Sequence, residues 1–247
     1  MQLRTGILLG VVGLGLSAAT ASADVSLNIF QITAYPESNP SAAITRTYWR
    51  QARDLDPNAL HTWNLDPLLD DNGTPGNTAD DWGFEGGSVT VNQDPAVNLT
   101  VNAAAGSSNT VFTINSALVS FGTIGDLQAR ASVTLSITDS ALFAPTGAVN
   151  LSAGFGDGNA FQARIKGAAW MGLLPVGTYS PPAGGSIAYF QETSASLIPV
   201  AGTATNISTH FKFTLSPRDR VSGTSTFEII PAPSSLGLLA GAGAMAL

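Results

Sequence analysis

Short runs in which apolar and polar residues alternate, separated by turn-forming residues, constrain this chain most. Val97, Leu99 and Val101 alternate with Asn and Thr residues, and the same pattern recurs over 133–138 and 211–215. A period of two places one side of each run in a core and the other in water, as in antiparallel sheets. Turn residues gather at 106–109, 154–159 and 181–185. No stretch carries a sustained helical period, so we expect an all-β fold, an antiparallel, jelly-roll-like β-sandwich.

Residues 35–87 depart from this pattern, and we expect an irregular, loop-rich segment there. The segment contains several prolines and few clean alternations. Ser41 to Arg53 fits two structures. It could form a short helix capped by Ser41, with Ile44 and Tyr48 on one face. It could equally form a strand, because Tyr48 and Trp49 favour β-structure.

The N-terminal 23 residues have the pattern of a secretory signal peptide. Arg4 precedes an apolar run over 6–16, and the small residues Ala21 and Ala23 stand where a signal peptidase cleaves. We therefore expect the mature chain to begin at Asp24. Residues 24–230 are of a suitable length for a single β-sandwich domain.

The C-terminal residues have the composition of a membrane-directed tail. Pro231-Ala232-Pro233 follows the last alternating run, and 236–247 contain only Leu, Ala, Gly and Met. A helix that spans a bilayer needs about 20 apolar residues, so these twelve would be only the beginning of a span. A buried C-terminal helix or a frayed tail is the alternative.

The signal peptide, β-rich body, proline pair and apolar tail together resemble the PEP-CTERM sorting signal of exopolysaccharide-producing Gram-negative bacteria. Pro231 and Pro233 match the motif prolines, and Ala232 stands in place of the central acid. The chain ends at Leu247, before the arginine cluster of that family. The resemblance implies an exosortase-type processing enzyme as a partner, and a transient membrane tether at 231–247.

The charge balance and the absence of cysteine exclude several classes of protein. The chain has 10 basic and 17 acidic residues, only two of the basic ones being lysines, and a formal net charge of −7. Such a chain is poorly suited to neutralising the phosphates of a nucleic acid. With no cysteine, it has no disulfides, iron–sulfur clusters or thiolate zinc sites.

Acidic residues are concentrated between Asp54 and Glu85, where no Lys or Arg interrupts them. Carboxylates interspersed with Asn and Gly are typical of oxygen-rich loops that bind calcium, although the EF-hand spacing is not met. The alternative is a solvated loop whose Asp and Asn side chains stabilise turns. The calcium ligands would be Asp66, Asp70, Asp71, Asp80 and Asp81.

Trp63 and Trp82 flank the acidic loop, and exposed aromatic rings beside Asp and Asn can bind sugars. The alternative is that both rings belong to the core. Arg46, Arg50 and Arg53 precede the loop; we expect them to form salt bridges within the fold, with contact to an anionic polysaccharide as the other interpretation.

Motifs for catalysis are weak. A Ser-His-Asp triad would need His61 or His210, no Gly-x-Ser-x-Gly motif is present, and we expect His210 to face solvent. We therefore assign no catalytic residue and no cofactor other than calcium. The sequence favours an exported, non-catalytic protein of the cell envelope, cell surface or extracellular matrix. A secreted carbohydrate-binding module that uses the Trp63/Trp82 loop is the alternative, and extracellular polysaccharide is an expected partner of either. A secreted hydrolase is the third interpretation, and it would need a pocket that the sequence does not reveal.

Overall fold

The computed structural model describes residues 26–51, 60–70, 81–92, 95–116, 118–139, 148–192 and 197–232. Fifteen strands and one 3₁₀ turn, η1 (Pro40–Ala42), make up its regular structure, and no helix among these residues is long and apolar enough to cross a membrane. The strands are β1 (Ser26–Pro36), β2 (Ile44–Gln51), β3 (His61–Leu65), β4 (Leu68–Asp70), β5 (Trp82–Asn92), β6 (Ala96–Ala104), β7 (Thr110–Ser116), β8 (Val119–Thr138), β9 (Val149–Ser152), β10 (Asn159–Ile165), β11 (Ala168–Pro175), β12 (Gly177–Tyr179), β13 (Ser186–Glu192), β14 (Ile198–Leu215) and β15 (Arg220–Pro231).

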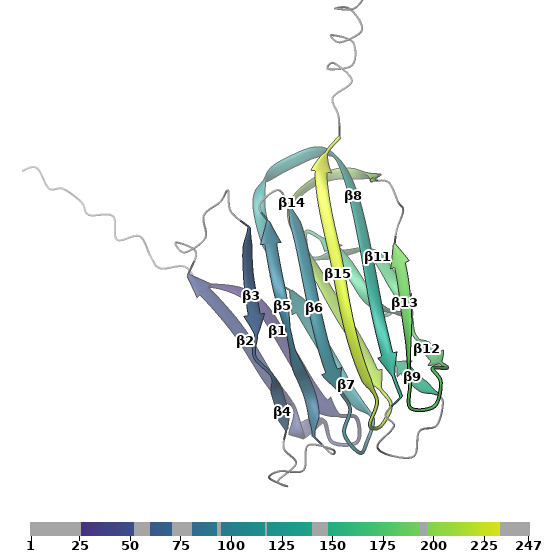
Figure 1. Cartoon of the computed structure of the whole chain (residues 1–247). Helices are drawn as coiled ribbons and strands as arrows, with labels where there is room; N and C mark the ends of the chain where they lie inside the picture. The colour runs from purple at the N-terminus through teal and green to yellow at the C-terminus, as the bar shows by residue number, and fades with distance from the viewer. Residues whose placement is uncertain are drawn as a thin grey trace, which may run out of the picture.

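All neighbouring strands pair antiparallel in one continuous sheet that folds into two layers (Figure 1). The front layer runs β13-β8-β15-β6-β5, with β3 and β4 both paired to β5. The back layer runs β2-β1-β7-β14-β10-β11, with β9 and β12 beside the end of β14. The predicted all-β, sandwich-like fold is therefore confirmed.

The long strands β8 and β14 join the two layers. Their first halves pair with each other between Val119–Ala129 and Ile198–Ile207, at the upper end of Figure 1. Their second halves then separate: β8 pairs with β13 and β15 in the front layer, whereas β14 pairs with β7 and β10 in the back layer. This connection curls the sheet like half of a barrel.

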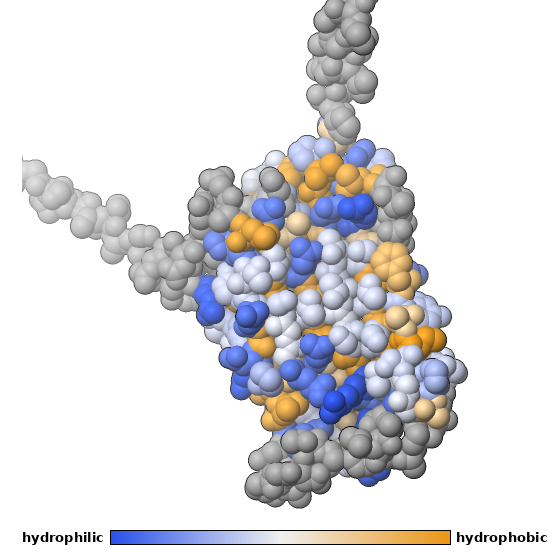
Figure 2. Space-filling view, viewed as in Figure 1, coloured by the Kyte–Doolittle hydropathy of each residue, from blue (hydrophilic) through white to orange (hydrophobic). Residues whose placement is uncertain are grey.

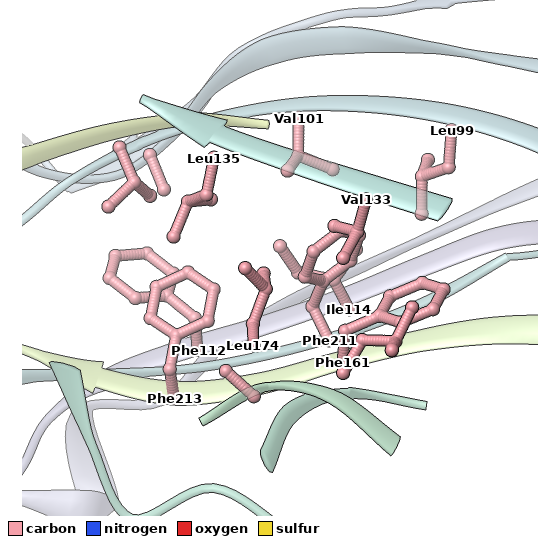
Figure 3. Close-up of a cluster of buried hydrophobic side chains, with 14 of the residues drawn as sticks. Leu99, Val101, Phe112, Ile114, Val133, Leu135, Phe161, Leu174, Phe211 and Phe213 are labelled. Atoms are coloured by element: carbon pink, nitrogen blue, oxygen red, sulfur yellow. The ribbon is translucent and has the colours of Figure 1, made fainter. Parts of the chain in front are cut away.

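The alternating residues of the sequence form the core between the layers. Leu99, Val101, Val133 and Leu135 of the front layer face Phe112, Ile114, Phe161, Phe211 and Phe213 of the back layer, and Leu174 lies among them (Figure 3). The rings of Phe112 and Phe213 lie 5.3 Å apart and those of Phe161 and Phe211 lie 5.1 Å apart, tilted or edge-on as aromatic pairs prefer.

The segment 35–87 is more regular than predicted. Ser41 to Arg53 contains the edge strand β2, and β3, β4 and the first half of β5 follow it, so the strand alternative is confirmed and the helix alternative is wrong. Ile44 and Tyr48 lie four residues apart, which places them on one side of a helix and of a strand alike. Pairing with β1 therefore determines the structure here.

Candidate functional site

The outward side of the front layer carries rows of small, neutral polar side chains. Residues directly opposite each other on paired strands share one side of the sheet. These residues, which we call the hydroxyl–amide face, are Ser132, Thr226, Asn98, Thr90 and Thr62 in one row, Thr134, Thr224, Thr100, Ser88 and Asn64 in the next, and Ser136, Ser222 and Asn102 in a third. Figure 2 shows this area as a mostly pale field with a few blue groups within it.

Each row follows directly from the alternation that builds the core. In β6, Val97, Leu99 and Val101 are buried, so Asn98 and Thr100 between them point outward. Strands lie about 4.8 Å apart, so a row that crosses five strands extends over about 19 Å. The sequence shows the polar residues that alternate with the buried apolar ones. Only the strand order shows that these polar residues form one surface.

Charged residues border the hydroxyl–amide face but do not lie within it. Arg130 of β8 pairs with Glu228 of β15 at 2.6 Å at one end, and Arg220 of β15 pairs with Glu85 of β5 at 3.3 Å at the other. Phe190 of β13 lies opposite Thr134, and its side chain is 61% exposed. The face can therefore exchange hydrogen bonds with a neutral partner, next to one accessible aromatic ring.

The acidic residues predicted to bind calcium are only partly described. Asp66 is exposed between β3 and β4, where its backbone carbonyl accepts a hydrogen bond from the Tyr48 hydroxyl at 2.7 Å. Asp70 ends β4, and Asp81 immediately precedes β5. Asp71 and Asp80 lie outside the described residues. Within the described part of the chain, no group of three or more His, Asp or Glu side chains could hold a metal ion, and calcium binding by the loop stays a prediction.

The two tryptophans beside the acidic loop face the core. Trp82 is 5% exposed, and Trp63 is half-buried against the core, with its ring stacked on that of His61 at 5.7 Å. Trp82 therefore does not offer a ring face to a sugar. Arg46 donates a hydrogen bond to the Pro67 carbonyl at 2.9 Å and Arg50 to the Trp49 carbonyl at 3.1 Å, and Arg53 is not among the described residues.

The predicted processing sites lie at or beyond the ends of the described residues. Pro231 ends β15, and the Ala232 backbone N–H donates to the Asp126 carbonyl at 2.5 Å. Pro233, Ala21 and Ala23 lie outside the described residues. The described chain therefore ends where β15 ends beside β8, at the top of Figure 1.

His210 points to the outer side of β14, but it is less exposed there than the prediction that it faces solvent implies. It lies half-buried in β14 with Nδ1 2.5 Å from Asn115 Oδ1 and Nε2 2.9 Å from Ser208 Oγ. Burial, and secondarily the positive charge of Arg164, lower the pKa of His210 to about 4. The neutral ring fits these contacts as a donor at Nδ1 and an acceptor at Nε2.

Ser208, His210 and Asn115 have the arrangement of a nucleophile, a base and an orienting group. However, Ser208 is only 3% exposed, so its hydroxyl does not reach the surface. The contacts continue sideways instead, from Asn115 to Gln31 at 3.5 Å and from Gln31 to Thr47 at 3.3 Å. These side chains thus form a hydrogen-bonded row across four strands of the back layer.

No known protein family matches this chain, and no curated protein or solved structure is significantly similar to it. Its function must be inferred from its own residues.

Proposed function

We propose that this chain is an exported, non-catalytic protein of a Gram-negative cell envelope, cell surface or extracellular matrix. In this proposal residues 1–23 direct export, and the segment 231–247 serves as a transient membrane tether that an exosortase-type enzyme processes. The folded body then acts by contact, through the hydroxyl–amide face.

The composition of that face is the observation that carries the proposal. Ser, Thr and Asn side chains both donate and accept hydrogen bonds, as do the hydroxyls of a neutral polysaccharide. Protein interfaces instead depend on Trp, Tyr and Arg anchors, none of which occurs among the face residues. A neutral, hydroxyl-rich matrix polymer is therefore the partner we favour, with Phe190 available to pack against the apolar side of a sugar ring.

Replacing the motif prolines tests the delivery part of the proposal. We expect Pro231→Ala combined with Pro233→Ala to change the mass of the mature protein and to shift it between membrane and extracellular fractions. Pro182→Ala, in an exposed turn, is the matched control and should leave both unchanged. Unchanged mass and distribution in the double variant would show that these prolines are not a sorting signal.

A charge placed in the middle of the face tests the contact part. We expect Thr224→Lys to weaken retention in the matrix fraction several-fold, because a lysine there must keep its hydration shell against a neutral polymer. Thr45→Lys introduces the same side chain at an exposed strand position of the back layer. Equal retention of both variants would show that the hydroxyl–amide face does not contact the matrix.

A further inference from the structure

A pocket of about 410 Å³ lies at the lower end of the back layer, away from the hydroxyl–amide face. Its lining residues come mainly from β9, from β12 beside it and from the end of β14, which pairs with β9. Figure 1 shows β9 and β12 at the lower end of the molecule. Its lining residues are Asn109, Asn150, Leu151, Ser152, Val176, Gly177, Thr178, Thr214 and Ser216. A volume of this size is in the usual range for pockets that bind small molecules.

The lining is neutral and rich in hydrogen-bonding groups. Two amides and four hydroxyls stand beside the apolar residues Leu151 and Val176, and none of the described lining residues carries a charge. A charged ligand would lose its hydration without gaining an ion pair. A neutral ligand with several hydroxyls would retain its hydrogen bonds and place its C–H groups against the apolar residues.

Thr214 gives an independent indication that the pocket takes a polar ligand. Its side chain is 1% exposed, it lines the pocket, and its Oγ1 has no hydrogen-bond partner in the described protein. Buried hydroxyls are nearly always hydrogen-bonded, so this one calls for an explanation. A hydroxyl of a bound ligand would supply the partner once the Thr214 side chain turns its Oγ1, which is itself buried in this structure, toward the pocket.

Four of the five other polar side chains in the lining are already held in place. The Thr178 hydroxyl donates to Asn150 Oδ1 at 2.6 Å, and Asn109 Nδ2 donates to Glu37 Oε2 at 2.8 Å. Ser216 Oγ accepts from the Asn150 backbone N–H at 2.8 Å and donates to Asp219 Oδ2. These contacts leave the Asn150 Nδ2 donor and the Asn109 Oδ1 acceptor for a ligand, at little ordering cost.

We propose that this pocket binds a neutral sugar residue at the end of a glycan chain. A second pocket of about 510 Å³, which is also lined by Arg218 and Asp219, shares Asn150 and Ser216 with it and offers space for the adjoining residue. This inference goes beyond the proposed function, because it assigns a second site, specific for a chain end, on a different part of the molecule.

The test measures binding of methyl glycosides of glucose, galactose, mannose and N-acetylglucosamine to the purified protein by NMR titration. We expect at least one of them to give saturable shifts of the Asn109 and Asn150 side-chain amides. Glucuronic acid should give none. If no neutral glycoside saturates at tens of millimolar, or if glucuronic acid binds as well, the proposal is wrong.

Two substitutions separate a ligand-binding role of the pocket from a structural one. Thr214→Val removes the unpartnered hydroxyl, so we expect at least five-fold weaker binding with an unchanged or raised Tm. Gly177→Leu should abolish binding, because a Cβ at Gly177 meets nothing within 4 Å and the side chain can extend into the pocket. Parent-like affinity in both variants would overturn the proposal.

Thr224→Lys on the hydroxyl–amide face is the control, and it should bind the glycoside as the parent does. If it weakens binding as much as Thr214→Val, the ligand occupies the face and the pocket proposal is wrong. Since this titration uses purified protein, its failure is distinguishable from a failure of sorting or matrix retention in cells.

Discussion

At the scale of single residues, the sequence places side chains on strands but does not show what covers them. His210 is predicted to face outward from an alternating strand, and it does lie on the outer side of β14. Asn115 and Ser208 contact it, and Gln162 lies opposite it on β10, so side chains from its own strand and from both neighbouring strands surround it. Apart from Ser208, these neighbours are distant along the chain. No local pattern could have revealed them.

The lowered pKa of His210 predicts a loss of stability in mild acid. The unfolded chain takes up the proton near pH 6.5, whereas the folded chain takes it up only near pH 4. The contribution of neutral His210 to the free energy of unfolding is therefore complete above pH 6.5 and falls as the pH decreases to about 4. The total loss amounts to about 3 kcal/mol.

Urea unfolding at pH 7.5, 5.5 and 4 measures this effect. His210→Gln keeps a donor and an acceptor but does not titrate, so its free energy of unfolding should fall less over this range. Parallel curves for the parent and the variant would mean that the pKa of His210 is the same in the folded and unfolded chain.

At the scale of elements, the sequence predicted the strands with clean alternation and left the others open. β6, the second half of β8 and the second half of β14 were predicted because each has one buried and one exposed side. β2 and β3 lie at the sheet edges, where half-buried residues weaken the alternation. The pairing of β8 with β14 joins residues about 80 positions apart, and no pattern in either strand specifies it.

Close approach of β5 and β6 gives a prediction at this scale. A Cβ at Gly87 would lie 2.1 Å from the Thr100 carbonyl oxygen, which belongs to the backbone of the neighbouring strand. Gly87→Ala must therefore displace β5 from β6, and we expect it to destabilise the fold by about 2 kcal/mol or more.

Gly125→Ala is the matched control, because a Cβ at Gly125 meets nothing within 4 Å. Its free energy of unfolding should stay within about 0.5 kcal/mol of the parent. Equal melting temperatures for the two variants would mean that the strands separate at no cost.

At the scale of the whole molecule, the sandwich architecture was predictable and the candidate sites were not. The Trp63/Trp82 loop is a candidate sugar-binding site on sequence alone, because its aromatic and acidic residues are close in sequence, yet Trp82 belongs to the core. The hydroxyl–amide face and the pocket beside Thr214 are assembled from strands distant in sequence. Recognising them requires the order of the strands.

The strand β15 runs between the two ends of the molecule. It begins at Arg220, directly after Asp219 of the second pocket, and it ends at Pro231. Twelve extended residues span about 40 Å, so the glycan pocket and the proposed tether lie at opposite ends.

Site-specific labels test this separation, because the chain contains no native cysteine. A fluorophore on Gly125→Cys, near Ala232, should be quenched by spin-labelled lipids in the membrane-tethered protein. The same fluorophore on Ser107→Cys, beside the second pocket, should remain bright. Equal quenching at both positions would mean that the protein lies flat on the bilayer.

An upright orientation would make the rigid sandwich a spacer. While the tether is intact, β15 would hold the pocket several nanometres outside the lipid headgroups, where it could capture the free ends of polymers that never touch the membrane. Once the tether is cut, the same captured polymer would carry the protein away from the cell.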